Sequence, residues 1–108
     1  MTIVVNVARD FSALPMGRFA EHSPFSGSRF RDELLIPALE QGPTVIDLTG
    51  TRGRSASFLD EAFARLLDRG FSLPTLRLRL DVRADDDPSV VVLVWRLLED
   101  RATRLEHA

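Results

Sequence analysis

The 108-residue sequence contains no cysteine and no lysine, and only two histidines. The absence of cysteine excludes a disulfide framework, a thiolate metal site and a cysteine nucleophile. His22 and His107 do not have the short spacing of metal ligands. Without lysine there is also no complete nucleoside-triphosphate loop, because that motif uses a lysine to reach the phosphates. We therefore expect no metal, no cofactor and no catalytic residue, and we interpret the protein as a non-enzyme.

All 14 basic residues are arginine, and the formal net charge is −2. One interpretation is selection for the paired hydrogen bonds that a guanidinium forms with phosphate or carboxylate. The other is codon bias, which the scattering of the arginines along the chain favours. Neither the net charge nor this distribution indicates nucleic-acid binding.

Long apolar runs are also absent. The longest, VVVLVW at 90–95, is far shorter than the roughly 20 residues that a membrane-spanning helix needs. The first residues, MTIVVNV, are too short and too uncharged for a signal peptide. We expect a cytoplasmic protein of a single domain, 1–108, that does not associate with membranes.

The N-terminal part of the sequence predicts a strand followed by a long loop. The β-branched run at 2–7 is typical of a strand. Residues 8–28 are rich in Pro, Gly and Ser, and we interpret them as irregular, with a second short strand near 17–20. The loop is too apolar to remain free in solvent, since it carries Phe11, Leu14, Met16, Phe19 and Phe25. We expect it to pack over one end of the sheet or against another chain, which makes a homodimer a further expectation.

Residues 29–42 have the apolar periodicity of a helix. Ser28 is its predicted N-cap, and Gly42 is its predicted C-terminal stop. Pro37 should remove the hydrogen bond to the Glu33 carbonyl and bend the helix.

Three further elements follow from pattern alone. TVIDL at 44–48 predicts a largely buried strand. Residues 57–70 predict a helix with an apolar stripe that includes Phe58 and Phe63. Alternation of apolar and polar residues over 76–82 predicts a strand with one face in water.

The last element begins after three consecutive aspartates. Asp87 followed by Pro88 is typical of a helix N-cap and first helical residue, so we predict a helix although the valines that follow favour a strand. Asp85, Asp86 and Asp87 could form a cation site, but a solvated loop that leads into an N-cap is the simpler interpretation. Strands that alternate with helices predict a small α/β sandwich, with three to four strands in a mixed sheet and about three helices.

The turn between strand 44–48 and helix 57–70 has the setting of an anion site. Gly50, Gly53 and Ser55 precede a helix N-terminus, and Arg52 and Arg54 could hold a phosphate. The turn lacks the spacing of known nucleotide-binding loops. A small phosphate- or nucleotide-binding domain is therefore the alternative function, and an enzyme of unrecognised chemistry is a third.

Ser57 has a simple structural interpretation. Ser57 and Asp60 fit a capping box, in which the serine is the N-cap and the carboxylate lies three residues later. Asp60 and Glu61 would then occupy the first helical turn, near the positive end of the helix dipole.

The segment from residue 26 to 70 resembles the bacterial STAS-like domain family of unknown function, a relative of the anti-sigma factor antagonists and of sulfate-transporter STAS domains. Ser28 and Arg29, the strand at 45–48 and Gly50 contribute to the resemblance. The most specific element is a Phe-x-Asp-Glu-x-Phe motif made by Phe58, Asp60, Glu61 and Phe63.

The resemblance implies a regulatory, protein-interaction domain. In the antagonists, a serine at the corresponding helix N-terminus is phosphorylated by a histidine-kinase-like ATPase. Ser57 is in that position and Ser55 is close by, although the antagonists have Asp-Ser-Ser-Gly where this chain has Ser-Ala-Ser-Phe at 55–58. The resemblance thus implies an ATPase of that class, or an anti-sigma-type protein, as the partner.

Overall fold

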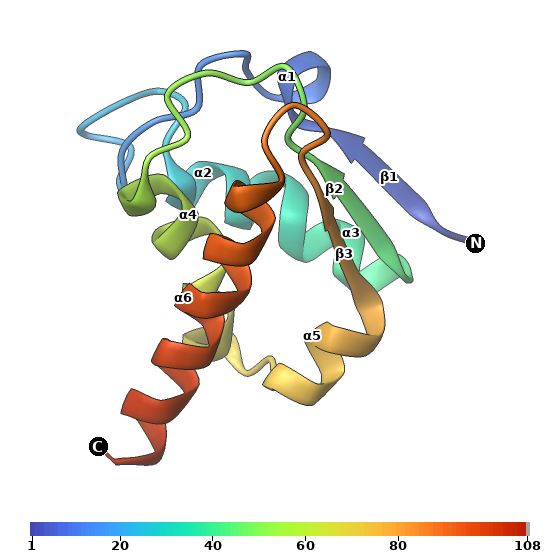
Figure 1. Ribbon diagram of the computed structural model, residues 1–108, viewed down its shortest axis with the longest axis vertical. Coiled ribbons are helices and arrows are strands. Elements are labelled where there is room, and N and C mark those ends of the chain that lie inside the picture. The colour runs from blue at the N-terminus through green and yellow to red at the C-terminus, as the bar shows by residue number, and fades with distance from the viewer. Residues whose placement is uncertain (108) are drawn as a thin grey trace.

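A parallel sheet of three strands organises the computed structural model, which describes residues 1–107 (Figure 1). Strands β1 (Ile3–Asn6), β2 (Thr44–Asp47) and β3 (Leu80–Arg83) lie in the order β1-β2-β3, and both pairs are parallel. The α/β prediction is confirmed, and the prediction of a mixed sheet is wrong. Helical segments connect each strand to the next, so the chain returns to the same end of the sheet before every strand begins.

The helical elements are short except for the last. They are α1 (Val7–Asp10), α2 (Gly27–Phe30), the π-helical η1 (Arg31–Leu35), α3 (Ile36–Gln41), α4 (Ala56–Ala62), the 3-10 helix η2 (Ala64–Arg69), α5 (Leu73–Arg79) and α6 (Pro88–Glu106). No helix in the described part of the chain combines the length and the apolar character needed to cross a membrane.

The helices α2, α4 and α6 lie on one side of the sheet (Figure 1). The side chains of Val5, Ile46 and Val82 are buried in the layer between sheet and helices. On the opposite face Val4 remains 59% exposed, and Asp81 is exposed as well. This two-layer arrangement gives the domain one core, because a sheet with one buried face needs only one layer of helices.

Phenylalanines of α2, of α4 and of the position directly after α4 form the centre of the core. Phe30, Phe58 and Phe63 are fully buried, and the ring centroid of Phe30 lies 5.9 Å from that of Phe58 and 6.1 Å from that of Phe63. Close approach of α2 to α4 depends on Gly27, since a Cβ at this position would lie 2.7 Å from the Phe58 carbonyl oxygen.

The predicted helix at 29–42 forms, but it begins at Gly27, and its middle part, η1, is π-helical rather than α-helical. Ser26, not Ser28, is the N-cap, and its hydroxyl accepts a hydrogen bond from the backbone N–H of Arg29. Pro37 has no N–H to donate to the Glu33 carbonyl, as predicted. The preceding segment η1 forms a π-turn, so the chain continues as a helix around the missing bond.

The strand predicted over 76–82 is wrong for its first half. Residues 73–79 form α5, and only the last part of the predicted segment belongs to β3. Ser72 caps α5 by accepting from the Thr75 N–H, and Pro74 lies in the first turn, so the helix start outweighs the alternating pattern. Leu76, Leu80 and Val82 are buried, whereas Leu78 is 86% exposed, so the alternation marks a buried face only in part.

The predicted start of the last helix is confirmed, since Asp87 caps α6 by accepting from the Ser89 N–H.

The prediction of a second short strand near 17–20 is wrong, because no strand forms there. Instead the Met16 N–H donates to the Phe25 carbonyl and closes a loop at 11–26.

Candidate functional site

The turn between β2 and α4 is held by hydrogen bonds to its own chain and to the loop before α6. The Thr51 hydroxyl donates to the Leu48 carbonyl over 2.7 Å, and the Arg54 guanidinium donates to the same carbonyl over 2.8 Å. The Gly50 N–H donates to the Asp86 carboxylate, which also forms an ion pair with Arg54 at 3.2 Å. These contacts lower the pKa of Asp86, first because of the Gly50 N–H and then because of the arginine.

The two arginines of the turn have different surroundings. The Arg54 side chain is only 13% exposed and is occupied by the contacts above. The Arg52 side chain is exposed, and its backbone N–H donates to the Ala13 carbonyl of the 11–26 loop. A phosphate site needs both guanidinium groups to face one concavity, and only Arg52 faces solvent here. The same hydrogen bond packs the loop against the turn, at the end of the sheet where β2 ends.

The start of α4 corrects the predicted cap. Ser55, not Ser57, is the N-cap: its backbone is extended and its hydroxyl accepts from the Phe58 N–H at 3.3 Å. The cap therefore lies two residues before its predicted position, and the helix begins at Ala56. Ser57 is exposed in the first turn, and no hydrogen bond to its hydroxyl is found within residues 1–107. The predicted capping box with Asp60 is wrong.

Asp60 and Glu61 consequently lie beyond the first turn, where they form ion pairs instead of meeting the helix dipole. Arg18 contacts Asp60 at 2.6 Å and Glu61 at 3.7 Å. Arg31 contacts the Glu61 carboxylate at 2.7 Å and the Glu61 backbone carbonyl at 2.9 Å. Arg31 and Glu61 are buried, with 6% and 7% of their surface exposed.

The sequence did not identify Arg18 and Arg31 as the partners of Asp60 and Glu61. Arg31 did carry a signal, because it shares the apolar helix face of Leu35 and Ala38 at helical spacing, and an arginine on such a face needs a buried acidic partner. Arg18 lies in an irregular loop, where periodicity gives no information about its partner.

The family model described as a STAS-like domain of unknown function matches residues 26–89, which is more than half of the chain. The chain belongs to this family. No curated protein and no solved structure gives a significant match. The family match confirms the resemblance and extends it beyond residue 70 to the start of α6.

The residues that carry the STAS-like resemblance have structural roles in the fold. Phe58 and Phe63 fill the core, and Asp60 and Glu61 connect α4 to the loop and to η1. Arg29 forms an exposed ion pair with Glu33 at 2.7 Å and a hydrogen bond to the Pro24 carbonyl. That ion pair lowers the pKa of Glu33.

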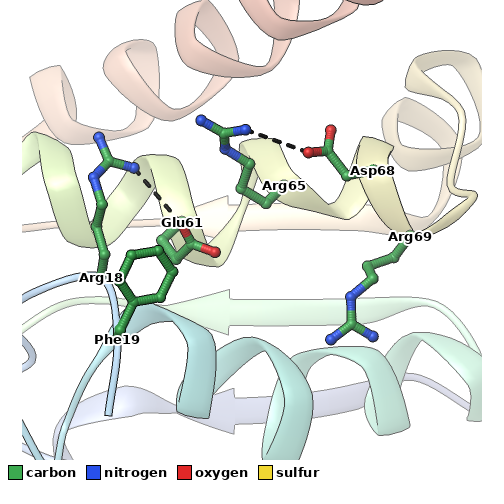
Figure 2. Close-up of a pocket in the computed structure, with 6 residues that line it drawn as sticks. All are labelled: Arg18, Phe19, Glu61, Arg65, Asp68 and Arg69. Carbon is green, nitrogen blue, oxygen red and sulfur yellow. Dashed lines mark hydrogen bonds and ion pairs between the residues drawn. The ribbon is translucent and has the colours of Figure 1, made fainter. Parts of the chain in front are cut away.

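Beside α4 the STAS-like domain has a hollow of about 340 Å³ with mixed charge (Figure 2). It is lined by Arg18, Phe19, Glu61, Arg65, Asp68 and Arg69. Asp68 forms ion pairs with Arg101 at 2.8 Å and with Arg65 at 3.3 Å, and the hydrogen bonds from Arg101 are the largest cause of the lowered pKa of Asp68. Because its arginines alternate with carboxylates, the hollow has the character of an ion-pair network rather than of an anion site.

The three aspartates before α6 have structural roles rather than the geometry of a cation site. The Asp85 backbone N–H donates to the Thr49 hydroxyl, while the Asp86 carboxylate holds the turn and Asp87 caps the helix. Within residues 1–107 no group of three or more His, Cys, Asp or Glu side chains is placed to hold a metal ion.

Proposed function

We propose that this STAS-like domain is a non-enzymatic regulatory module that binds a partner protein. The contact surface is the turn at 50–58 together with the exposed side of α4. The partner is a histidine-kinase-like ATPase or an anti-sigma-type protein, and Ser57 is the residue that the ATPase phosphorylates. The ATPase would transfer the γ-phosphoryl group of ATP to the Ser57 oxygen, with release of ADP and of the hydroxyl proton.

The observation that carries this proposal is the free hydroxyl of Ser57. It is exposed in the first turn of α4 and takes no part in the cap, which Ser55 provides. A kinase can therefore reach it without breaking a hydrogen bond of the fold. A phosphate at a helix N-terminus also meets the positive end of the helix dipole. Ser55 is the weaker candidate, because its oxygen already accepts from the Phe58 N–H.

The alternative proposal is a phosphate- or nucleotide-binding turn, and the contacts of the turn support it less. Gly50 and Gly53 have positive φ angles of 84° and 65°, which shape a tight turn before α4. Arg54, however, is bound to Leu48 and Asp86, so a ligand would have to displace these contacts.

Phosphotransfer is the direct test. The purified domain is incubated with ATP and a histidine-kinase-like ATPase from the same organism, and the sites of modification are located by tandem mass spectrometry. We expect one phosphate on Ser57 and none in a Ser57→Ala variant. A phosphate on Ser55 alone, or no phosphate with any such ATPase, would contradict the assignment of Ser57.

A further inference from the structure

The loop at 11–26 and the turn after β2 form one continuous surface. The loop exposes four apolar side chains, each 40–47% accessible, namely Leu14, Met16, Phe19 and Phe25. It is joined to the turn by the hydrogen bond from Arg52 to Ala13. A partner that binds at the turn therefore also meets the apolar side chains of this loop.

Arg18 is the residue through which this loop forms ion pairs with α4 in the described chain. Its guanidinium lies 2.6 Å from the Asp60 carboxylate and 3.7 Å from that of Glu61, and the side chain is 37% exposed (Figure 2 shows the pair with Glu61). The position of Arg18 thus links the loop to the charges on α4.

Both carboxylates have a second arginine close by. Glu61 is held by the buried Arg31 at 2.7 Å. The Arg65 Nε lies 3.6 Å from the Asp60 carboxylate, and this buried N–H has no hydrogen-bond partner within the described residues. If Arg18 moves away from Asp60 and Glu61, each carboxylate still has an arginine beside it. A small rotation of Asp60 would let its carboxylate accept a hydrogen bond from the unpaired N–H of Arg65.

Ser57 lies one helical turn before Asp60. Side chains three apart on a helix are neighbours, with roughly 5–6 Å between their Cβ atoms. A phosphate on Ser57 would add about −1.5 to −2 charge and three acceptor oxygens within reach of the guanidinium that now holds Asp60. It would also repel Asp60. Arginine can form two parallel hydrogen bonds with either group, but the phosphate carries the larger negative charge, so it is the stronger partner.

Building on the proposed function, we propose that Arg18 binds the phosphate of phosphorylated Ser57. Arg18 leaves Asp60, Arg65 replaces it there, and the loop that carries Met16 and Phe19 shifts with its arginine. Phosphorylation then changes the apolar part of the partner surface as well as its charge.

The test uses the full chain with phosphoserine installed at position 57 during synthesis, so it needs no kinase. The second pKa of the phosphate is measured by ³¹P NMR, and it lies near 6 for a free phosphoserine. We expect a lower value in the parent, and a rise of about half a pH unit in Arg18→Gln, because a bound cation favours the dianion. Arg52→Gln is the matched control, since it removes an exposed cation from the adjacent turn.

A pKa that is the same in parent and Arg18→Gln, or one that moves only in Arg52→Gln, would overturn the proposal. A second readout needs no variant: the Met16 methyl resonance should shift when Ser57 is phosphorylated, and an unmoved resonance would also overturn it. Because the phosphate is installed directly, this result is independent of whether an ATPase phosphorylates Ser57. Failure here with phosphotransfer observed would leave the proposed function intact.

Discussion

The two serines at the start of α4 should respond differently to the same substitution. Ser55→Ala removes the oxygen that accepts from the Phe58 N–H and leaves that donor without its cap. Ser57→Ala removes an exposed hydroxyl for which no hydrogen bond is found in the described chain. The pair is matched, since both variants delete one hydroxyl oxygen at the start of the same helix.

The expected magnitudes follow from these positions. Loss of a serine N-cap costs about 1 kcal/mol of unfolding free energy. For a domain of this size, that corresponds to a decrease in Tm of about 4–6 °C. At Ser57 alanine is the better helix former, so the free energy should stay within about 0.5 kcal/mol of the parent, on the stabilising side.

The assay is urea unfolding followed by circular dichroism, with thermal unfolding as a second measurement. Equal slopes in urea are required, so that a shift of the midpoint reports stability alone. If Ser57→Ala costs about 1 kcal/mol and Ser55→Ala costs nothing, Ser57 is the cap and the assigned start of α4 is wrong. If Ser57→Ala leaves the stability unchanged, it also serves as a variant that cannot be phosphorylated and keeps the stability of the parent.

Three further outcomes are expected. Phe63→Ala should cost about 3–5 kcal/mol, because Phe63 is fully buried against Phe30, and a variant that melts like the parent would show that this core is misplaced. The lowered pKa of Asp68 contributes stability above its unfolded pKa near 3.9, which is lost as pH falls through the lower folded value. The stability of Asp68→Asn, followed by urea unfolding from pH 5 to pH 2, should therefore fall less on acidification than that of the parent, and an equal fall would contradict the ion pair with Arg101. Millimolar ATP or GTP should leave the Tm unchanged, since a ligand that binds the native state must raise it, and a clear rise would favour the phosphate-binding alternative.

The sequence predicts the architecture where local and long-range preferences agree. The β-branched run before Val7 and the apolar segment at 44–48 both form strands of the sheet, and Asp87 followed by Pro88 fixes the start of α6. The alternation at 76–82 misleads, because an N-cap at Ser72 starts a helix whose Leu78 stays in solvent.

The candidate site is less predictable, because its contacts join distant parts of the chain. The motif Phe58-x-Asp60-Glu61-x-Phe63 could be identified from sequence, but not the arginines that bind its carboxylates. The choice between Ser55 and Ser57 as cap depends on the backbone of the preceding turn, which is fixed by Arg54 and its bond to the Leu48 carbonyl. Two serines separated by one residue look equivalent until that turn is known.

The central claim is that this domain binds a partner protein at the turn and α4, under the control of charge at Ser57. Calorimetric titration of a cognate ATPase or anti-sigma-type protein with parent, Ser57→Ala and Ser57→Asp tests it most directly. We expect parent and Ser57→Ala to bind equally and Ser57→Asp to bind about tenfold more weakly, or about 1.4 kcal/mol. Equal binding by all three, with Ser57→Asp shown to be folded, would contradict the claim.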